Sequence, residues 1–263
     1  MLMMLVLIIL AVAFFYAGIF LGKKEKRIHL PVLGFILLPV VVRIISTQTS
    51  LNFPPFNWFI GGRIADLIVC FCVLVIFGAG YGSIEIRRKR IAITVFSVLI
   101  TMFYVIYPEF FSIFLQGKLQ KLQGNIYKEG ICFQTSRYSC GPASAVMFLH
   151  AVGVKSTEAE MAALAETNNL TGTYIDKLTN AVNIKLKPAG LKAKYEKTDY
   201  DTIQSLNKPF LAKINLRFMV DHYIVVFEVT DDEVIVGDPL EGRGLYSKKA
   251  FLKKWRRVVI RSY

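Results

Sequence analysis

Long apolar stretches alternate with short polar connections through the first 115 residues. Four of these stretches are continuous enough to form helices. They cover residues 1–21, 29–45, 64–80 and 91–115. A helix needs about 20 apolar residues to cross the hydrocarbon core of a bilayer. The pattern therefore predicts an all-α transmembrane region of about four helices, in which the second and third are short.

From residue 116 onward, the apolar positions have the spacing expected of a globular domain. Apolar residues at helical intervals predict three helices in its first part. They cover residues 140–152, 157–168 and 173–185. Alternation of apolar and polar residues from Phe210 to Phe218 then predicts a half-buried strand.

Further strands are expected on both sides of this segment. The predicted strands cover residues 126–133, 191–195, 223–229, 233–237 and 258–261, with a short helix at 248–255. Helices come first and antiparallel strands later, which is typical of an α+β domain. We predict a linker at residues 116–124, then one domain at residues 125–263 whose N-terminal helices pack on an antiparallel sheet.

The charge pattern gives an orientation to the membrane region. The chain carries a formal net charge of +13, and two basic clusters, residues 23–27 and 87–90, follow the first and third apolar stretches. Short loops rich in Lys and Arg stay in the cytoplasm. In a four-span chain both clusters fall on one side. We therefore expect an integral protein of a bacterial inner membrane, with the domain after the fourth span outside the cytoplasm.

A strongly basic chain also raises the question of nucleic acid binding. No basic helix and no platform of aromatic and basic residues accompanies the charge in this sequence. We therefore expect the lipid bilayer to be a partner and expect no nucleic acid.

Asp66 is a carboxylate that falls within a predicted span. It has two interpretations: a functional ionisable site inside the membrane, or an ion pair with Arg63 about one turn away. We favour the ion pair.

The four cysteines are Cys70, Cys72, Cys132 and Cys140. They do not form a disulfide framework. Cys70 and Cys72 lie in an apolar run without His or carboxylate neighbours at metal-ligand spacing. We expect packing roles for Cys70, Cys72 and Cys132, and neither a metal ion nor a cofactor.

Cys140 differs from the other cysteines because a loop enters a predicted helix at this residue. The N-terminus of a helix lowers the pKa of a thiol and offers backbone N–H groups to negative charge. Gln134 lies six residues upstream in the loop, where its side-chain amide can point to the same place. These residues predict a thiolate nucleophile with an oxyanion hole formed by the Gln134 amide and the Cys140 N–H.

A histidine must act as the base for this thiol, and the chain has three. His29 flanks a predicted span, and His150 lies ten residues beyond Cys140, roughly 15 Å along the same helix. His222 remains, at the start of a predicted strand. Asp238 ends the neighbouring strand of the hairpin and can accept a hydrogen bond from the imidazole. Asp221 is the alternative partner, but successive strand residues point to opposite faces, so we favour Asp238.

Three motifs in this order resemble the bacteriocin-processing (C39-type, papain-like) cysteine peptidase domain. They are Gln134-x5-Cys140-Gly-Pro-Ala-Ser, Asp221-His222-Tyr-Ile-Val-Val and Gly237-Asp238-Pro239. The resemblance covers residues from about 130 to 257. It implies that Cys140 is the nucleophile, His222 the general base and acid, Asp238 the residue that orients it, and Gln134 the oxyanion donor. It also implies cleavage after a Gly-Gly pair in a leader peptide.

The chain departs from the usual arrangement of this family. Typical members precede the membrane part of an ABC transporter, whereas here the domain follows a membrane segment and no P-loop is present. We therefore expect a membrane-bound thiol peptidase that acts on a peptide or secreted precursor, with export machinery as a separate partner. A thiol acyltransferase on the same fold and a non-catalytic peptide-binding protein are the alternative interpretations.

Overall fold

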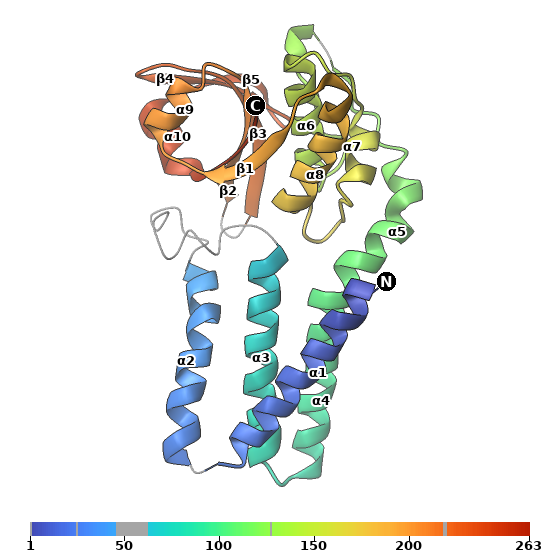
Figure 1. Cartoon of the computed structure of the whole chain (residues 1–263), viewed down its shortest axis with the longest axis vertical. Coiled ribbons are helices and arrows are strands. Elements are labelled where there is room, and N and C mark those ends of the chain that lie inside the picture. The colour runs from blue at the N-terminus through green and yellow to red at the C-terminus, as the bar shows by residue number, and fades with distance from the viewer. Residues whose placement is uncertain (1, 25, 46–62, 127, 218–219) are drawn as a thin grey trace. The chain divides into compact units, whose positions relative to one another are not determined.

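The chain divides into two compact units (Figure 1). The computed structural model describes residues 2–24, 26–45, 63–126, 128–217 and 220–263. The first unit contains the described residues up to 111, and the second contains those from 112 onward. The division falls inside the last predicted span, a few residues before the predicted linker at residues 116–124.

The first unit is all helical, as the apolar pattern predicts. Its helices are α1 (Leu2–Gly22), α2 (Lys26–Ile45), α3 (Arg63–Ser83) and α4 (Arg87–Thr101). A π-helical turn at Met102–Ile106 joins α4 to α5 (Tyr107–Leu119), which carries the chain into the second unit. Each predicted span is therefore a helix, and Met1 of the first one lies outside the described residues.

Among the described helices, three are long and apolar enough to cross a membrane. They are Met4–Gly22, Ala65–Ser83 and Arg87–Ile106. The apolar part of α2, Pro31–Ile45, is shorter than a full span. The predicted helical region of about four helices is confirmed, while the number of helices that cross a membrane stays a prediction.

Glycines allow α1 and α3 to meet backbone to backbone. The glycines at the contact are four residues apart on each helix: Gly18 and Gly22 on α1, and Gly78 and Gly82 on α3. A Cβ atom at Gly78 would lie 2.1 Å from the carbonyl oxygen of Phe15. Small residues at this spacing are a common way for helices to associate in membranes, because they allow close van der Waals contact. Ser83 Oγ also donates to the carbonyl oxygen of Gly22 at 2.9 Å, so the ends of the two helices lie together.

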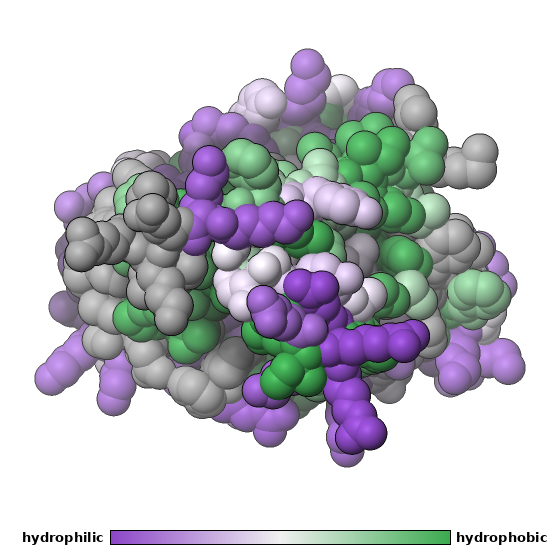
Figure 2. Space-filling model, turned by 90° about the horizontal axis from the view of Figure 1, so that it is seen from below, coloured by the Kyte–Doolittle hydropathy of each residue, from purple (hydrophilic) through white to green (hydrophobic). Residues whose placement is uncertain are grey.

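This contact also brings the basic clusters to the same end of the helical unit. Lys23 and Lys24 follow α1, and Arg87 to Arg90 begin α4 just after the end of α3. Hydrophilic residues gather beside hydrophobic ones on the face seen from this end (Figure 2). The side of the membrane on which this end lies stays a prediction.

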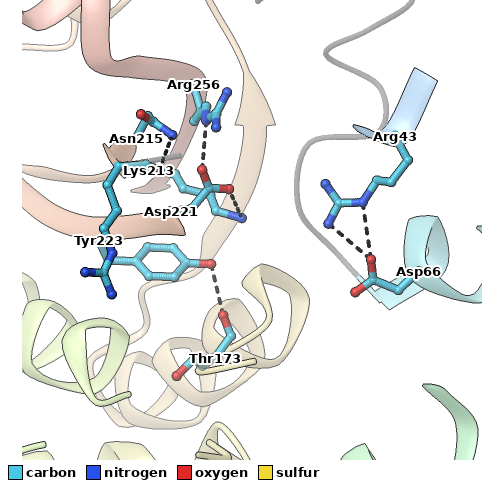
Figure 3. A network of polar contacts seen from close by, with 9 residues as sticks. Arg43, Asp66, Thr173, Lys213, Asn215, Asp221, Tyr223 and Arg256 are labelled. Carbon is cyan, nitrogen blue, oxygen red and sulfur yellow. Dashed lines mark hydrogen bonds and ion pairs between the residues drawn. The ribbon is translucent and has the colours of Figure 1, made fainter. Parts of the chain in front are cut away.

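Asp66, on α3, forms an ion pair with a residue of the neighbouring helix α2. Its Oδ1 accepts hydrogen bonds from Arg43 Nε at 3.3 Å and Nη2 at 3.1 Å (Figure 3). The expected partner was Arg63, whose side chain lies outside the described residues. The interpretation of Asp66 as an ion-paired residue therefore holds, with Arg43, 23 residues away, as a partner that local spacing did not indicate.

Six strands in the described part of the second unit form one antiparallel sheet. The order is β1-β6-β2-β3-β4-β5. The strands are β1 (Ala193–Lys197), β2 (Phe210–Arg217), β3 (Val220–Val229), β4 (Glu233–Asp238), β5 (Gly242–Ser247) and β6 (Trp255–Ser262). Phe218, the last residue of the predicted alternation, lies outside the described residues.

Helices cover both faces of this sheet (Figure 1). They are α6 (Cys140–Ala151), α7 (Glu158–Leu164), α8 (Ile175–Leu186), α9 (Tyr200–Ser205) and α10 (Lys248–Lys254). One core joins α6, α7 and α8 to the sheet through residues such as Phe148, Leu178 and Val225. A second core packs α9 and α10 on the opposite face, around Trp255 and Ile224. The predicted α+β fold, with N-terminal helices packed on an antiparallel sheet, is confirmed.

Several predicted elements differ in extent or kind. In place of the predicted strand at residues 126–133, Ile126 and Cys132 form a single bridge and Lys128–Gly130 form a 3₁₀ turn. Positive φ angles at Glu129 and Gly130 break the extended backbone there. The second helix ends at Leu164 instead of residue 168. The short elements α9 and β5 were not predicted.

The glycine contact can be tested with one substitution at two neighbouring sites. Gly78→Ala should lower the Tm of the full chain in detergent by several degrees, because the new Cβ collides with the backbone of α1. Gly80→Ala is the matched control, since its Cβ would meet only the Ile93 side chain at an ordinary 3.6 Å. Equal Tm values for the two variants would contradict the packing described here.

Candidate active site

Cys140 is the first residue of α6 and is half-buried. The preceding residue, Ser139, is fully buried at the N-cap position. The first backbone N–H groups of a helix have no carbonyl partner one turn back, so they are available to a negative charge. The thiol therefore lies where the sequence places it, at a helix start that favours an anion.

A hydrogen bond and a close approach hold this end of α6 near β3. Ser144 Oγ donates to the carbonyl oxygen of Tyr223 at 2.8 Å. A Cβ atom at Gly141 would come within 3.0 Å of Thr173 Cβ and 3.4 Å of the Tyr223 ring. Glycine at position 141 and a small hydroxyl residue at position 144 therefore allow the thiol to approach the strand that carries His222.

His222 and Asp238 are joined by a hydrogen bond across two neighbouring strands. His222 Nε2 and Asp238 Oδ1 lie 2.8 Å apart, and the residues are only 2% and 5% exposed. The register pairs Val225 with Gly237, so Asp238 lies opposite Ile224 and reaches His222 diagonally. Leu240 N–H also donates to Asp238 Oδ1 at 2.8 Å, which holds the carboxylate at the end of β4.

The surroundings of His222 favour its charged form. Burial alone would lower the pKa of the imidazole, but hydrogen bonds with Asp238 and Cys140 raise it from 6.5 to about 9. Burial also acts to raise the pKa of Asp238, and the hydrogen bond and positive charge of His222 outweigh it, so the net shift is downward. Folding raises the pKa of His222, so its contribution to stability is complete below pH 6.5 and is lost as the pH rises through about 9.

Gln134 lies in the loop before α6 and is anchored next to Asp238. Its backbone N–H donates to the carbonyl oxygen of Pro239 at 2.9 Å. Its side-chain Nε2 donates to the carbonyl oxygen of Ser136 at 2.7 Å, while Oε1 is buried without a hydrogen-bond partner. An amide nitrogen carries two hydrogens, so one bond to Ser136 leaves a second donor.

Asp221 belongs to a different set of contacts. Its Oδ2 lies 3.1 Å from Lys213 Nζ, and its Oδ1 accepts from Arg256 Nε at 2.8 Å (Figure 3). Burial acts to raise the pKa of Asp221, but Lys213 and Arg256 lower it overall. The carboxylate next to His222 in sequence is thus engaged with two cations, and the imidazole is bonded to Asp238.

The remaining cysteines and histidines lie apart from this arrangement. Cys132 is 0% exposed, and burial together with the negative charge of Glu158 raises its pKa to about 12. His150 is exposed in the last turn of α6. The side chain of His29 is outside the described residues. Among the described residues, no group of three or more His, Cys, Asp or Glu side chains forms a metal site.

The sequence did not indicate that one buried residue, Glu158, contacts this region. Glu158, at the start of α7, accepts hydrogen bonds from Thr135, the neighbour of Gln134. A Glu in the first turn of a short helix looks like an ordinary helix-dipole residue. The donors are 23 and 34 residues away, so no local signal indicated them.

A family comparison agrees with the motifs. The model of the peptidase C39 family matches residues 128–262, which is half of the chain. The chain belongs to the peptidase C39 family. The helical region before residue 128 lies outside the match.

Relatives of this C39 domain occur in proteins of different lengths. A protein of unassigned function from Methanothermobacter thermautotrophicus is 32% identical over 123 residues, which is 47% of this chain and 80% of that protein. The lactococcin-G-processing and transport ATP-binding protein LagD of Lactococcus lactis is 31% identical over 134 residues, or 49% of this chain. The match covers only 18% of LagD and, at 30% identity, 17% of the pediocin PA-1 transport/processing protein PedD of Pediococcus acidilactici.

Solved C39 structures also resemble this part of the chain. The peptidase domain of Streptococcus ComA, a bifunctional ABC transporter of a quorum-sensing pathway, is 24% identical with a TM-score of 0.44. The likeness covers 54% of this chain and 97% of that domain. A double glycine motif protease from an AMS/PCAT transporter, in complex with its leader peptide, is 15% identical with a TM-score of 0.43 and covers 54% and 91% of the two chains.

The geometry predicts which cysteine reacts. Iodoacetamide at pH 7 should alkylate Cys140 and leave Cys132 unmodified, because Cys132 is inaccessible and has a pKa of about 12. His222→Gln should slow the alkylation about tenfold or more, because it removes the imidazole that contacts the thiol and can accept its proton. Peptide mass spectrometry over a time course measures both.

Cys132→Ser is the matched control for this experiment and should leave the rate at Cys140 unchanged. An unchanged rate in His222→Gln would show that the imidazole does not control the thiol.

Proposed function

We propose that this chain is a membrane-bound cysteine peptidase that acts through Cys140, His222 and Asp238, with Gln134 as oxyanion donor. The observation that carries the proposal is the buried hydrogen bond between His222 and Asp238, together with the contact of the same imidazole with Cys140 at a helix start. A thiol, an imidazole and an orienting carboxylate are the groups that thiol proteases need.

The charges of the site suit the first step of this reaction. With a pKa of about 9, His222 holds a proton at neutral pH. In the proposed reaction, the nucleophile beside it is the Cys140 thiolate. The thiolate attacks the substrate carbonyl carbon, and the carbonyl oxygen becomes an oxyanion. We assign the stabilisation of that charge to the Cys140 N–H and the Gln134 amide. His222 then gives its proton to the leaving amine as the C–N bond breaks, which leaves an acyl-enzyme.

Water completes the cycle in the proposed peptidase. His222, now neutral, takes a proton from water, and the resulting hydroxide attacks the thioester carbonyl. The thiolate leaves, and the free carboxyl product departs. Asp238 holds the imidazole in one orientation through both steps and stabilises its charged form.

Support for the substrate class comes from the relatives. LagD and PedD are named for processing and transport of lactococcin G and pediocin PA-1. One solved neighbour is a double glycine motif protease bound to a leader peptide. We therefore propose a peptide or secreted precursor as substrate, cleaved after a Gly-Gly pair, with separate export machinery as a partner.

The helical unit is proposed to anchor the peptidase in a membrane. Three of its described helices have the length and composition of spans, and its basic residues gather where α1 and α3 end. If that end faces the cytoplasm, as the excess of Lys and Arg favours, an odd number of spans between it and the peptidase domain places the domain outside.

The identity of the nucleophile gives the first test of this function. Cys140→Ala should abolish cleavage of a synthetic Gly-Gly leader peptide while the Tm of the full chain stays within a few degrees, because alanine suits a helix start. Product masses show the fate of the acyl-enzyme: addition of one water supports hydrolysis, and addition of an amine acceptor would establish an acyltransferase instead. Activity in Cys140→Ala, or binding without turnover in the wild type, would refute the proposal.

The role of Asp238 is tested against its neighbour Asp221. Asp238→Asn should lower kcat by about 100-fold or more with a smaller effect on KM, because an amide can present N–H where the imidazole needs an acceptor. Asp221→Asn should lower kcat only a few-fold, although its Tm should fall because Lys213 and the buried Arg256 lose their counter-charge.

Steady-state rates on one peptide and thermal unfolding of both variants decide this comparison. An inactive Asp221→Asn beside a fully active Asp238→Asn would refute the assigned triad.

A further inference from the structure

Glu158 is a fully buried carboxylate, 0% exposed, in the first turn of α7. Its Oε2 accepts hydrogen bonds from Gly124 N at 2.9 Å and from Thr135 Oγ1 at 2.7 Å, and its Oε1 accepts from Thr135 N at 2.9 Å. Burial of a carboxylate is costly unless hydrogen bonds compensate it. These donors come from two segments outside α7, so the carboxylate joins three parts of the chain.

The more important of these segments is the loop that carries Gln134. Thr135 follows Gln134 directly, and both its N–H and its hydroxyl are held by Glu158. The N–H of Gln134 is held from the other side by the carbonyl oxygen of Pro239. Two consecutive residues are thus fixed, one to α7 and one to the end of β4. The direction of the Gln134 amide depends on both attachments.

We propose that Glu158 is a positioning residue for the oxyanion hole. It acts through Thr135, holding the loop so that the Gln134 amide can face the oxyanion that forms at Cys140. The inference rests on the proposed function, because it assigns a task to a residue that supports the same site. The hydrogen bonds of the Glu158 carboxylate go to Gly124 and Thr135, so its proposed role is positioning and not catalysis.

The second segment, which follows α5, meets the same carboxylate. Gly124 both donates to Glu158 Oε2 and accepts from Glu158 N–H, at 3.3 Å, through its carbonyl oxygen. A Cβ atom at Gly124 would lie 2.4 Å from Oε2 and 2.8 Å from the carbonyl oxygen of Phe133. The connection from the helical region is therefore packed directly on the residue that holds the oxyanion loop. A side chain at position 124 would displace the carboxylate.

Glu158→Gln is the informative substitution because it keeps the size and removes one acceptor. In one amide orientation the new NH2 faces the N–H of Gly124, and in the other it faces the N–H of Thr135. Either way a buried donor loses its partner. The loop should remain folded but lose its fixed position, which affects a transition state that needs an oriented donor.

Three measurements on the full chain in detergent separate this role from a general structural one. With a Gly-Gly leader peptide, kcat of Glu158→Gln should fall about 10- to 100-fold while KM changes by less than about threefold. The Ki of a peptide aldehyde ending in glycinal should rise by a similar factor. The aldehyde accepts the thiolate at its carbonyl carbon and forms a hemithioacetal whose oxygen needs the same donors. Alkylation of Cys140 by iodoacetamide forms no oxyanion, so its rate should stay within about twofold.

Glu160→Gln on the same helix is the matched control, because Glu160 pairs with Lys185 and does not touch the loop. Its kcat should equal that of the wild type. Gly124→Ala, which pushes on the carboxylate from the other segment, should reproduce the kinetic pattern of Glu158→Gln. It provides the test if Glu158→Gln fails to fold.

The outcomes distinguish this inference from the proposed function. A wild-type chain that cleaves no peptide while Cys140 alkylates normally would count against the peptidase itself. A wild-type enzyme that is active, with Glu158→Gln or a folded Gly124→Ala equally active, would overturn the positioning role alone. Parallel loss of kcat and alkylation rate would also overturn it, because the thiol and not the oxyanion donor would then be disturbed.

Discussion

The arrangement of the peptidase domain depends on how closely the start of α6 can approach β3. Cys140 lies at the start of α6 and His222 near the start of β3, and both belong to rigid elements. Gly141 lacks the Cβ atom that would crowd Thr173 at 3.0 Å, and Ser144 donates a hydrogen bond to the backbone of Tyr223. Neither residue carries chemistry, yet this close approach brings the thiol into contact with the imidazole.

Beside this contact, the alternation of a β-strand separates two sets of charges. His222 joins Asp238, whereas Asp221 joins Lys213 and Arg256. Successive side chains of a strand point to opposite faces, so two adjacent residues serve two networks without mixing them. The separation has an electrostatic consequence. The carboxylate that faces the imidazole is not neutralised by Lys213 or Arg256, and it remains able to stabilise the imidazolium.

The parts of this structure that local patterns encode could be predicted, and those that depend on distant contacts could not. The start of α6 follows from a loop, a proline in the first turn and apolar residues at helical spacing, and β2 to β4 follow from alternation and a turn. The pairing of Arg43 with Asp66 joins residues that are 23 positions apart, and the donors to Glu158 are 23 and 34 positions away from it. A periodic pattern of apolar residues does not indicate such contacts.

The prediction of a strand at residues 126–133 was wrong for a local reason, the positive φ angles of Glu129 and Gly130. The catalytic roles themselves are chemical hypotheses, which geometry makes testable.

The two units solve the problem of close packing by different physical means. In water, burial of apolar surface drives the helices onto the sheet, and polar groups such as Glu158 are accepted only where hydrogen bonds surround them. In a bilayer, lipid tails are as apolar as the side chains, so burial gives little preference for one helix pair over another. In the proposed membrane anchor, Gly18, Gly22, Gly78 and Gly82 would supply that preference through backbone contact, which is short-ranged and sensitive to a single methyl group. In the peptidase domain Gly124 and Gly141 serve a related purpose, because each lets a backbone approach a side chain on which the site depends. Glycine thus marks the points at which both halves of the chain need a contact closer than any side chain allows.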